Sequence, residues 1–397
     1  MSARLLIFLL SIVFFPFNSS STETKPIRIT IYPTIIDKKV VGSSTTIINK
    51  ETIKENAHLS LGQLLSKFSG INFENLYSGV DVKSSVRVRG FGEQATRNVL
   101  ILINGIRISD MTIAGANLSR ILAQNIQKIE IIRGGKGSLL FGDGATGGAV
   151  NIITKNPLYL EDKFQIKNSL KSFNTNKQVI SSTKKFNDYV FDYSLTNFET
   201  DGYRNNSEYD QSSFNFNLTN LNDGISRTFA EYKMTNEQTR LPGSILLTDF
   251  YENPKYTRFP EDFATEKISS IKLGGEKILQ NQNKITSNLR LENKDQYSSM
   301  LNWGIRYKSK TTLNTAHFNS QFISNNSSLF RDIIGKFGID IYNSTYKVDA
   351  NNWAYNQYIN KAEQQIIEPS IIIGIKDKKI TGLNYELGVR SHHYEID

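Results

Sequence analysis

Two glycine-rich segments and four histidines are the residues of this chain whose types and spacing could do chemistry. Gly142, Gly144 and Gly147 have the spacing of a dinucleotide-binding turn. That chemistry needs a helix directly after the glycines, because the helix N-terminus must meet the pyrophosphate. Residues 149–154 predict a strand instead, and no acidic residue ends a second strand nearby. We therefore expect no dinucleotide site here.

The other candidates for chemistry are also weak. Residues 134–138 (Gly-Gly-Lys-Gly-Ser) resemble a phosphate-binding loop but lack its Gly-Lys-Ser/Thr order, so we expect a tight turn there. None of the histidines lies near a Gly-x-Ser-x-Gly elbow or in a His-Glu-x-x-His motif. They are His58, His317, His392 and His393. The chain has no Cys, which excludes thiol nucleophiles, disulfides and Cys-ligated metals. We expect neither an enzyme nor a cofactor.

The net charge and the first residues narrow the class of protein. The net charge is +9, but the lysines are scattered among Asn, Ser and Ile rather than clustered, so we expect no nucleic-acid partner. Arg4 precedes an apolar run over residues 5–17 and a Ser-rich exit, which predicts a signal peptide over residues 1–21. The run is shorter than the ~20 residues of a membrane-spanning helix. The mature chain is expected to be exported.

The region from Val86 to Lys155 holds short apolar segments that end in Arg-Gly or Asn-Gly. Residues 86–88, 99–103 and 129–132 predict buried strands. Arg89 and Arg133 stand directly before Gly90 and Gly134, at strand ends. A buried charge without a partner costs several kcal/mol, so these arginines should be paired unless they lie at the surface.

In this order, the segments resemble the plug domain of the TonB-dependent outer-membrane receptors. The resemblance implies that Arg89-Gly90 and Arg133-Gly134 seat the plug against glutamates of a surrounding barrel. It also places ligand contacts in the plug apex and in a long loop over residues 238–263. The residues expected to bind ligand are Phe91, Glu93, Gln94, Arg97, Arg240 and Tyr251.

The segment before the plug lies where this family carries its TonB box, which pairs as an added strand with the periplasmic partner. Strand addition uses main-chain hydrogen bonds, so the side-chain pattern is loose, and a first plug strand is the alternative. The expected box is Ile27, Arg28, Ile29, Thr30, Ile31, Tyr32 and Pro33. This lead, residues 22–39, is too short for an additional signalling module.

After residue 163, segments of about ten residues alternate apolar or aromatic with polar side chains. Phe214, Phe216 and Leu218 alternate with polar residues, as in the strands of a transmembrane barrel. A soluble β-sandwich is the alternative. The long connections near residues 201 and 238 would fall on the same, outer side. Within the plug we expect an amphipathic helix between residues 50 and 70 and another over 118–126.

The predicted fold is an α+β plug domain over residues 40–155, followed by an antiparallel transmembrane β-barrel over residues 156–397. Plugged barrels of this kind have about 22 strands, whereas this segment has room for about half. We expect a truncated reading of a longer receptor, with completion by another chain as the alternative.

The predicted function is TonB-dependent uptake of a scarce chelate across the bacterial outer membrane, coupled to the proton motive force. We expect a ferric siderophore, with a cobalamin receptor as the alternative. A passive porin, an outer-membrane enzyme or a pure binding receptor remain as other classes. The expected partners are the TonB complex of the inner membrane, the chelate and outer-membrane lipid, with a monomer when complete. Asp201, Glu208 and Asp210 could hold Ca²⁺ in a loop, as a cobalamin receptor does.

Overall fold

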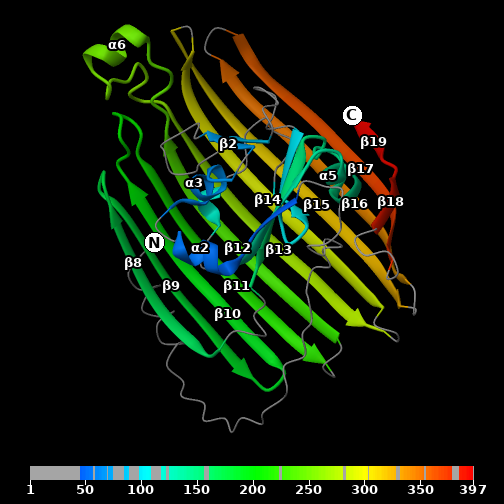
Figure 1. Cartoon of the computed structure of the whole chain (residues 1–397). Helices are drawn as coiled ribbons and strands as arrows, with labels where there is room; N and C mark the ends of the chain where they lie inside the picture. Colours follow the sequence, from blue (N-terminus) through cyan, green and yellow to red (C-terminus); the bar gives the residue numbers. More distant parts are fainter. Residues whose placement is uncertain are drawn as a thin grey trace.

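The computed structural model contains a small sheet held against one face of a large sheet (Figure 1). No helix in the part of the chain that the structure describes is long and apolar enough to cross a membrane. The expected signal peptide, the TonB box and residues 89–97 lie outside that part. The structure describes residues 45–56, 59–68, 70–74, 85–88, 98–108, 118–121, 125–155, 161–222, 226–279, 283–302, 304–327, 331–352, 355–377 and 384–396.

The small sheet forms the centre of the plug and has the strand order β1-β6-β7-β4-β5. β4 and β7 run parallel, and the other neighbours run antiparallel. The strands expected from the sequence at 86–88, 99–103 and 129–132 are all present. The bounds are β1 (Thr45–Ile48), β4 (Val99–Ile103), β5 (Ile106–Arg107), β6 (Ile126–Arg133), β7 (Gly148–Thr154) and a separate pair, β2 (Ile71–Glu74) with β3 (Ser85–Val88).

Two short helices stand where one was expected between residues 50 and 70. They are α2 (Lys50–Glu55) and α3 (Leu61–Ser66). The break follows from capping: the Ser60 hydroxyl accepts a hydrogen bond from the Gln63 backbone, and the Gln63 side chain accepts one from the Ser60 backbone. This reciprocal pair starts a new helix at residue 61. Buried residues of both helices, such as Ile53 and Leu65, join the plug core.

The helix expected over residues 118–126 was a wrong prediction. Leu118–Arg120 forms a single 3-10 turn, η1, and Ile126 is the first residue of β6. The segment from Ile126 forms a strand because it pairs with other strands of the plug sheet: β6 lies between β1 and β7, and its apolar residues Ile129 and Ile131 are fully buried. η1 nevertheless stays in the core through Leu118, which is also fully buried.

The large sheet, called the wall below, has 12 strands. Eleven follow the order β18 to β8, each antiparallel to the next, and the twelfth, β19, also pairs with β17. Figure 1 shows the plug lying across its concave face. An α+β plug followed by an antiparallel partial barrel is therefore confirmed. The strands are β8 (Lys163–Lys171), β9 (Thr175–Phe186), β10 (Tyr189–Thr200), β11 (Tyr209–Asn222), β12 (Ser226–Arg240), β13 (Phe263–Ile278), β14 (Lys284–Asn302), β15 (Ile305–Ser327), β16 (Arg331–Asn352), β17 (Tyr355–Asp377), β18 (Asn384–Arg390) and β19 (His393–Ile396).

The two faces of the wall differ in chemistry. On β13, Glu266 and Lys272 are buried on the plug side, whereas Ile271 and Leu273 are about half exposed on the other. A membrane-spanning barrel has this alternation, with apolar residues towards lipid. Residues 201–208 and 241–262 connect strands at the same end of the wall, and the second connection contains α6 (Leu247–Glu252). The two long connections expected on one side thus lie at the same end of the wall, which the sequence analysis expects to be the outer end.

Candidate functional site

The plug is joined to the wall through Arg120, at the end of η1. The Arg120 guanidinium lies 2.6 Å from Glu237 Oε1 on β12 and 2.9 Å from Glu266 Oε2 on β13. Arg120 Nε donates a second hydrogen bond to Glu237, at 3.0 Å. The side chains of both glutamates are at most 4% exposed, and that of Arg120 is 15% exposed. Such bidentate pairs fix orientation as well as charge.

Wall residues share the same two carboxylates. The Tyr209 hydroxyl donates to Glu237 Oε2 at 3.1 Å, and Lys294 Nζ lies 2.6 Å from Glu266 Oε1. Burial acts to lower the pKa of Arg120, but Glu237 and Glu266 outweigh it and hold that pKa well above its ordinary value. Arg120 is thus a permanent cation in a buried network, which we call the η1 seat.

A second polar contact lies at α5 (Lys136–Phe141) and the turn after it. The Asp143 backbone N–H donates to Glu368 Oε1 on β17 at 2.7 Å. Arg390 of β18 donates to the Leu140 carbonyl at 3.2 Å and also pairs with Glu368, at 2.9 Å, and with Asp340. We call this contact the α5 seat.

Gly142 makes the α5 seat possible. It ends α5 with a φ of +86°, and a Cβ built at this position would lie 1.9 Å from Glu368 Oε2. Only glycine accepts both the left-handed backbone and so close a carboxylate. Gly142, the first glycine of the segment with dinucleotide-like spacing, therefore allows the plug to approach the wall closely.

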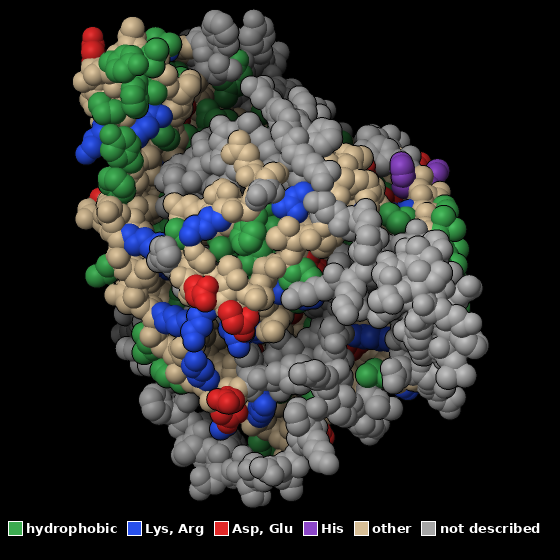
Figure 2. All heavy atoms as spheres, in the orientation of Figure 1, with side chains coloured by type: hydrophobic (Ala, Val, Ile, Leu, Met, Phe, Trp, Pro, Cys, Tyr) green, Lys and Arg blue, Asp and Glu red, His purple; other side chains and the backbone are tan. Residues whose placement is uncertain are grey.

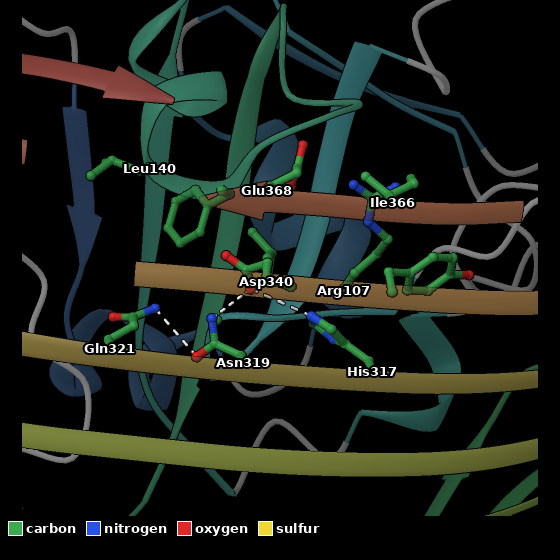
Figure 3. A pocket seen from close by; sticks show the side chains of 12 residues that line it. Arg107, Leu140, His317, Asn319, Gln321, Asp340, Ile366 and Glu368 are labelled. Atoms are coloured by element: carbon green, nitrogen blue, oxygen red, sulfur yellow. Dashed lines mark hydrogen bonds and ion pairs between the residues drawn. The ribbon is translucent and has the colours of Figure 1, made fainter. Parts of the chain in front are cut away.

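A small polar seam beside the α5 seat separates β5 from the wall (Figure 3). Arg107 lies over the ring of Tyr342, 5.6 Å from its centroid, and His317 Nε2 is 3.5 Å from Asp340 Oδ1. The Asn319 amide also donates to Asp340. The seam encloses about 20 Å³, which is room for about one water molecule. At this point the plug and the wall are in close contact.

Arg133 and Gly134, expected to seat the plug, lie within it. Arg133 is 8% exposed, and its guanidinium donates to the Thr46 hydroxyl on β1 at 2.7 Å. Gly134 has a φ of +77° and donates to the Gly147 carbonyl. These residues hold the plug sheet together where β1 and β7 meet β6. Their role in seating stays a prediction, and Arg89 and Gly90 lie outside the described residues.

Arg240 and Tyr251, expected to bind ligand, belong to the outer end of the wall. Arg240 ends β12, with its guanidinium 5.5 Å from the Phe263 ring centroid. Tyr251 on α6 is 76% exposed. Figure 2 shows hydrophobic side chains gathered over α6, on the face from which the plug is seen. Among the described residues, Arg240 and Tyr251 do not contact each other: Arg240 lies over Phe263, and Tyr251 packs against Phe250.

The loop that carries Tyr251 is held by side chains from the neighbouring loop. Arg204 donates to the Gly243 carbonyl at 2.5 Å and to the Tyr256 carbonyl at 2.8 Å. Asn206 donates to the carbonyls of Phe259 and Asp262. These bonds fix residues 241–262 as a platform at the outer end of the wall.

The residues considered for calcium in the same region are not gathered into a metal-binding group in the part of the chain that the structure describes. No three His, Cys, Asp or Glu side chains among the described residues come together in a way that could hold a metal ion. Asp201 instead accepts a hydrogen bond from Asn174, at 2.5 Å. Asp201 and Glu208 lie in the connection before β11, Asp210 lies in β11, and the three carboxylates show no shared ligand geometry.

Comparisons with known proteins agree with this architecture. Residues 37–149 match the family model of the TonB-dependent Receptor Plug Domain. Over 116 residues the chain is 34% identical to the vitamin B12 transporter BtuB of Photobacterium profundum, covering 29% of this chain and 18% of that protein.

Similar solved structures cover the wall as well. The ferric citrate transporter FecA, unliganded, has a TM-score of 0.69 at 14% identity, covering 89% of this chain and 60% of that one. The ferric yersiniabactin uptake receptor FyuA of Yersinia pestis has a TM-score of 0.68 at 12% identity, covering 89% and 61%. The chain spans less than two thirds of each of these relatives. It carries the plug domain of the TonB-dependent receptors, on a wall with the fold of their outer-membrane barrels.

Proposed function

We propose that the chain supplies the gate and part of the wall of a receptor that takes up a scarce chelate across the outer membrane. The observation that carries this proposal is the η1 seat, in which a plug arginine is buried between two wall glutamates. Removing one partner of a buried ion pair costs about 3–5 kcal/mol. A plug held in this way blocks passage until work is done on it.

The work would come from the inner membrane through TonB. The expected TonB box, residues 27–33, precedes β1, and β1 is an edge strand of the plug sheet, paired with β6 over four residues. Strand addition at the lead would let TonB transmit the proton motive force as a pull on this edge. The matched relatives are transporters and receptors, so the expectation that the chain is no enzyme is confirmed.

A ferric siderophore is the proposed ligand. The plug apex, with Phe91, Glu93, Gln94 and Arg97, would meet it from below, and the loop platform with Tyr251 would meet it from above. Exposed aromatic and aliphatic side chains on α6 suit a ligand with an organic shell. Solved structures with this fold include transporters named for ferric citrate and ferric yersiniabactin, which supports this class.

Cobalamin is the second candidate, and one observation favours it. The sequence match over the plug is to vitamin B12 transporters of Photobacterium profundum and Vibrio vulnificus, each at 34% identity. Both ligands are scarce and large, so both require the same gate.

Binding to outer membranes from cells that express the gene product distinguishes the candidates. The proposal expects saturable binding of a ferric siderophore, competed by other ferric siderophores and not by cyanocobalamin. Uptake, but not binding, should be lost in a strain without TonB. Competition by cyanocobalamin alone would assign the second ligand, and uptake that persists without TonB would contradict gated transport.

A further inference from the structure

Strand pairing shows which side chains of β8 and β9 face the plug. Residues that stand opposite each other on paired strands lie on the same face of the sheet. One such row starts at Glu237 of β12, which binds Arg120 of the plug, and ends on β8. The row is Glu237, Gln211, Phe198, Lys177 and Ser169. Lys177 Nζ lies 5.1 Å from the centroid of the Phe198 ring, so both side chains are on this inner face.

Lysines follow one another along the inner face of β8 and β9. Because side chains alternate along a strand, the inward residues of these two strands are the odd-numbered ones. They form six successive rows, of which five carry a lysine, and we call these lysines the lysine ladder. From Lys185 to the row of Lys171 the ladder spans about 30 Å, close to the hydrocarbon thickness of a bilayer. The rows are Lys185, Thr183-Lys163, Ser181-Gln165, Val179-Lys167, Lys177-Ser169 and Thr175-Lys171.

The opposite face of β8 has a different chemistry. Phe164, Ile166 and Leu170 are exposed on it, as expected of residues that face lipid in a barrel. On β9, the outward Lys184 lies 2.5 Å from Asp162 and so has an acidic partner. The ladder is therefore a property of the inner face and not of the two strands as a whole.

Acidic residues are few beside the ladder. No Asp or Glu occupies an inward position of β8 or β9 within the bounds that the structure gives these strands. On β10, Asp192 lies in the row of Thr183 and accepts a hydrogen bond from its hydroxyl at 2.7 Å. On β13 and β14, by contrast, the inward Lys294 lies 2.6 Å from the buried Glu266. The inner face of β8 and β9 therefore carries a net positive charge.

The two ends of the ladder lie at the two ends of the wall. Beyond Lys171, the Phe173 carbonyl accepts a hydrogen bond from Asp201 of the long outer connection. At the other end the plug adds positive charge: burial, together with the charges of Lys50, Lys167 and Lys163, lowers the pKa of Lys155. The ladder thus leads from the long connections to the end of the wall where the chain passes from plug to barrel.

We propose that the lysine ladder lines the passage of the transported ligand and that this ligand carries a net negative charge. The inference rests on the proposed function and narrows its ligand class, because an anionic ferric chelate suits the ladder and the neutral cyanocobalamin does not. The ladder belongs to the wall, so it stays in place when the plug moves. Successive rows are ~7 Å apart, which lets an anion pass from one lysine to the next. A face of one charge sign raises the local concentration of oppositely charged solutes about tenfold or more.

Two thiol reagents of similar size and opposite charge test the ladder in the full gene product, without a transported ligand. Ser181→Cys places the reporter in the ladder row that has no lysine, and the chain has no native Cys. The probes are methanethiosulfonates that carry a sulfonate or a trimethylammonium group. The ladder variant is Lys163→Gln with Lys167→Gln, and Lys163→Arg with Lys167→Arg keeps the charge. Lys184→Gln is the matched control, because Lys184 is exposed on the opposite face of β9.

The ladder predicts that the Ser181→Cys protein prefers the sulfonate reagent more strongly than 2-mercaptoethanol in solution does. Replacing the two lysines by Gln should lower this preference about tenfold, because two nearby positive charges are lost. The Arg variant and Lys184→Gln should keep it. An equal preference in all variants, or no preference in the protein with the complete ladder, would overturn the proposal.

Uptake by cells separates failure of the ladder from failure of the proposed function. Ferric citrate is the anionic probe and cyanocobalamin the neutral one. The proposal expects TonB-dependent uptake of ferric citrate that falls about tenfold in the ladder variant and is unchanged in Lys184→Gln. TonB-dependent uptake of cyanocobalamin that is equal in the wild type and the ladder variant would contradict an anionic passage and leave gated transport intact. Uptake that persists without TonB would instead contradict the proposed function.

Discussion

At the scale of single residues, burial decides which charges hold the plug. An exposed ion pair contributes about 0–1 kcal/mol, whereas removing one partner of a buried pair leaves an uncompensated charge. Arg120, Glu237 and Glu266 belong to the second kind. Among the described residues, the η1 seat is therefore a contact between plug and wall whose loss is costly.

Arg120→Ala should loosen the plug by about 3–5 kcal/mol, because Glu237 and Glu266 lose their shared cation. Pulse proteolysis of the plug in increasing urea measures the change. Arg258→Ala is the control, since Arg258 is exposed in the outer loop. Replacing both glutamates by Gln in the Arg120→Met background should restore part of the loss. Unchanged protection in Arg120→Ala would mean that the η1 seat does not hold the plug.

Gln94→Ala and Arg97→Ala should each weaken ligand binding while leaving the amount of exported protein unchanged. The reason is that the apex loop would present these polar groups to the ligand above the plug. Equilibrium binding to isolated outer membranes gives the affinity. Wild-type affinity in both variants would remove the apex from the binding site.

The sequence predicts the strands and the glycine turns of the plug, but it does not predict that Arg120 joins the plug to the wall. Two plug strands can be predicted from the local sequence, because each is a short apolar run with glycines or charges at its ends. They are Val99–Ile103 and Ile129–Ile132. Arg120 has no such local signal: its partners lie 117 and 146 residues further along the chain. Only the folded wall brings them together. The same limit produced the incorrect helix over residues 118–126.

At the scale of elements, α5 depends on close approach to the sheet beneath it. A Cβ built at Gly137 would lie 2.7 Å from the Ala145 carbonyl oxygen and 3.0 Å from the backbone of Gly148. Gly135, two residues away, has nothing within 4 Å of such a Cβ. The helix can therefore carry the α5 seat only if residue 137 has no side chain.

Gly137→Ala should destabilise the plug by about 1–3 kcal/mol, because the added methyl group must push α5 away from β7. Gly135→Ala is the matched control and should change stability little. The urea midpoint for proteolysis of the plug compares the two. Equal midpoints would show that α5 does not pack as closely as the structure indicates.

Ile29→Pro and Ile31→Pro should abolish uptake while ligand binding persists. Each proline removes a main-chain donor from the strand that TonB is expected to add to. Parallel binding and uptake assays in the same cells separate the two steps. Normal uptake in both variants would place the TonB contact elsewhere in the chain.

At the scale of the whole molecule, the plug and the wall are two units with different environments. The plug has an apolar core of its own, whereas the wall turns polar residues towards the plug and apolar residues outward. The contact between them is polar at the η1 and α5 seats, and beside the α5 seat it includes an apolar cluster of Ile132 and Leu140 of the plug with Ile372 of β17. Polar contacts can be exchanged for water when the plug moves, so this arrangement suits a gate.

A cross-link between the plug and the wall tests most directly whether the plug must move. A Cβ built at Gly388 of β18 would lie 2.7 Å from the end of the Leu139 side chain on α5, and the chain has no native Cys. The variant with Leu139→Cys and Gly388→Cys should therefore close a disulfide or a short bismaleimide bridge. With the disulfide closed, ligand binding should persist and uptake should stop; reduction should restore uptake, and each single-cysteine variant should transport normally. Uptake at the wild-type rate with the bridge fully closed would contradict a plug that leaves the wall at α5 to admit its ligand.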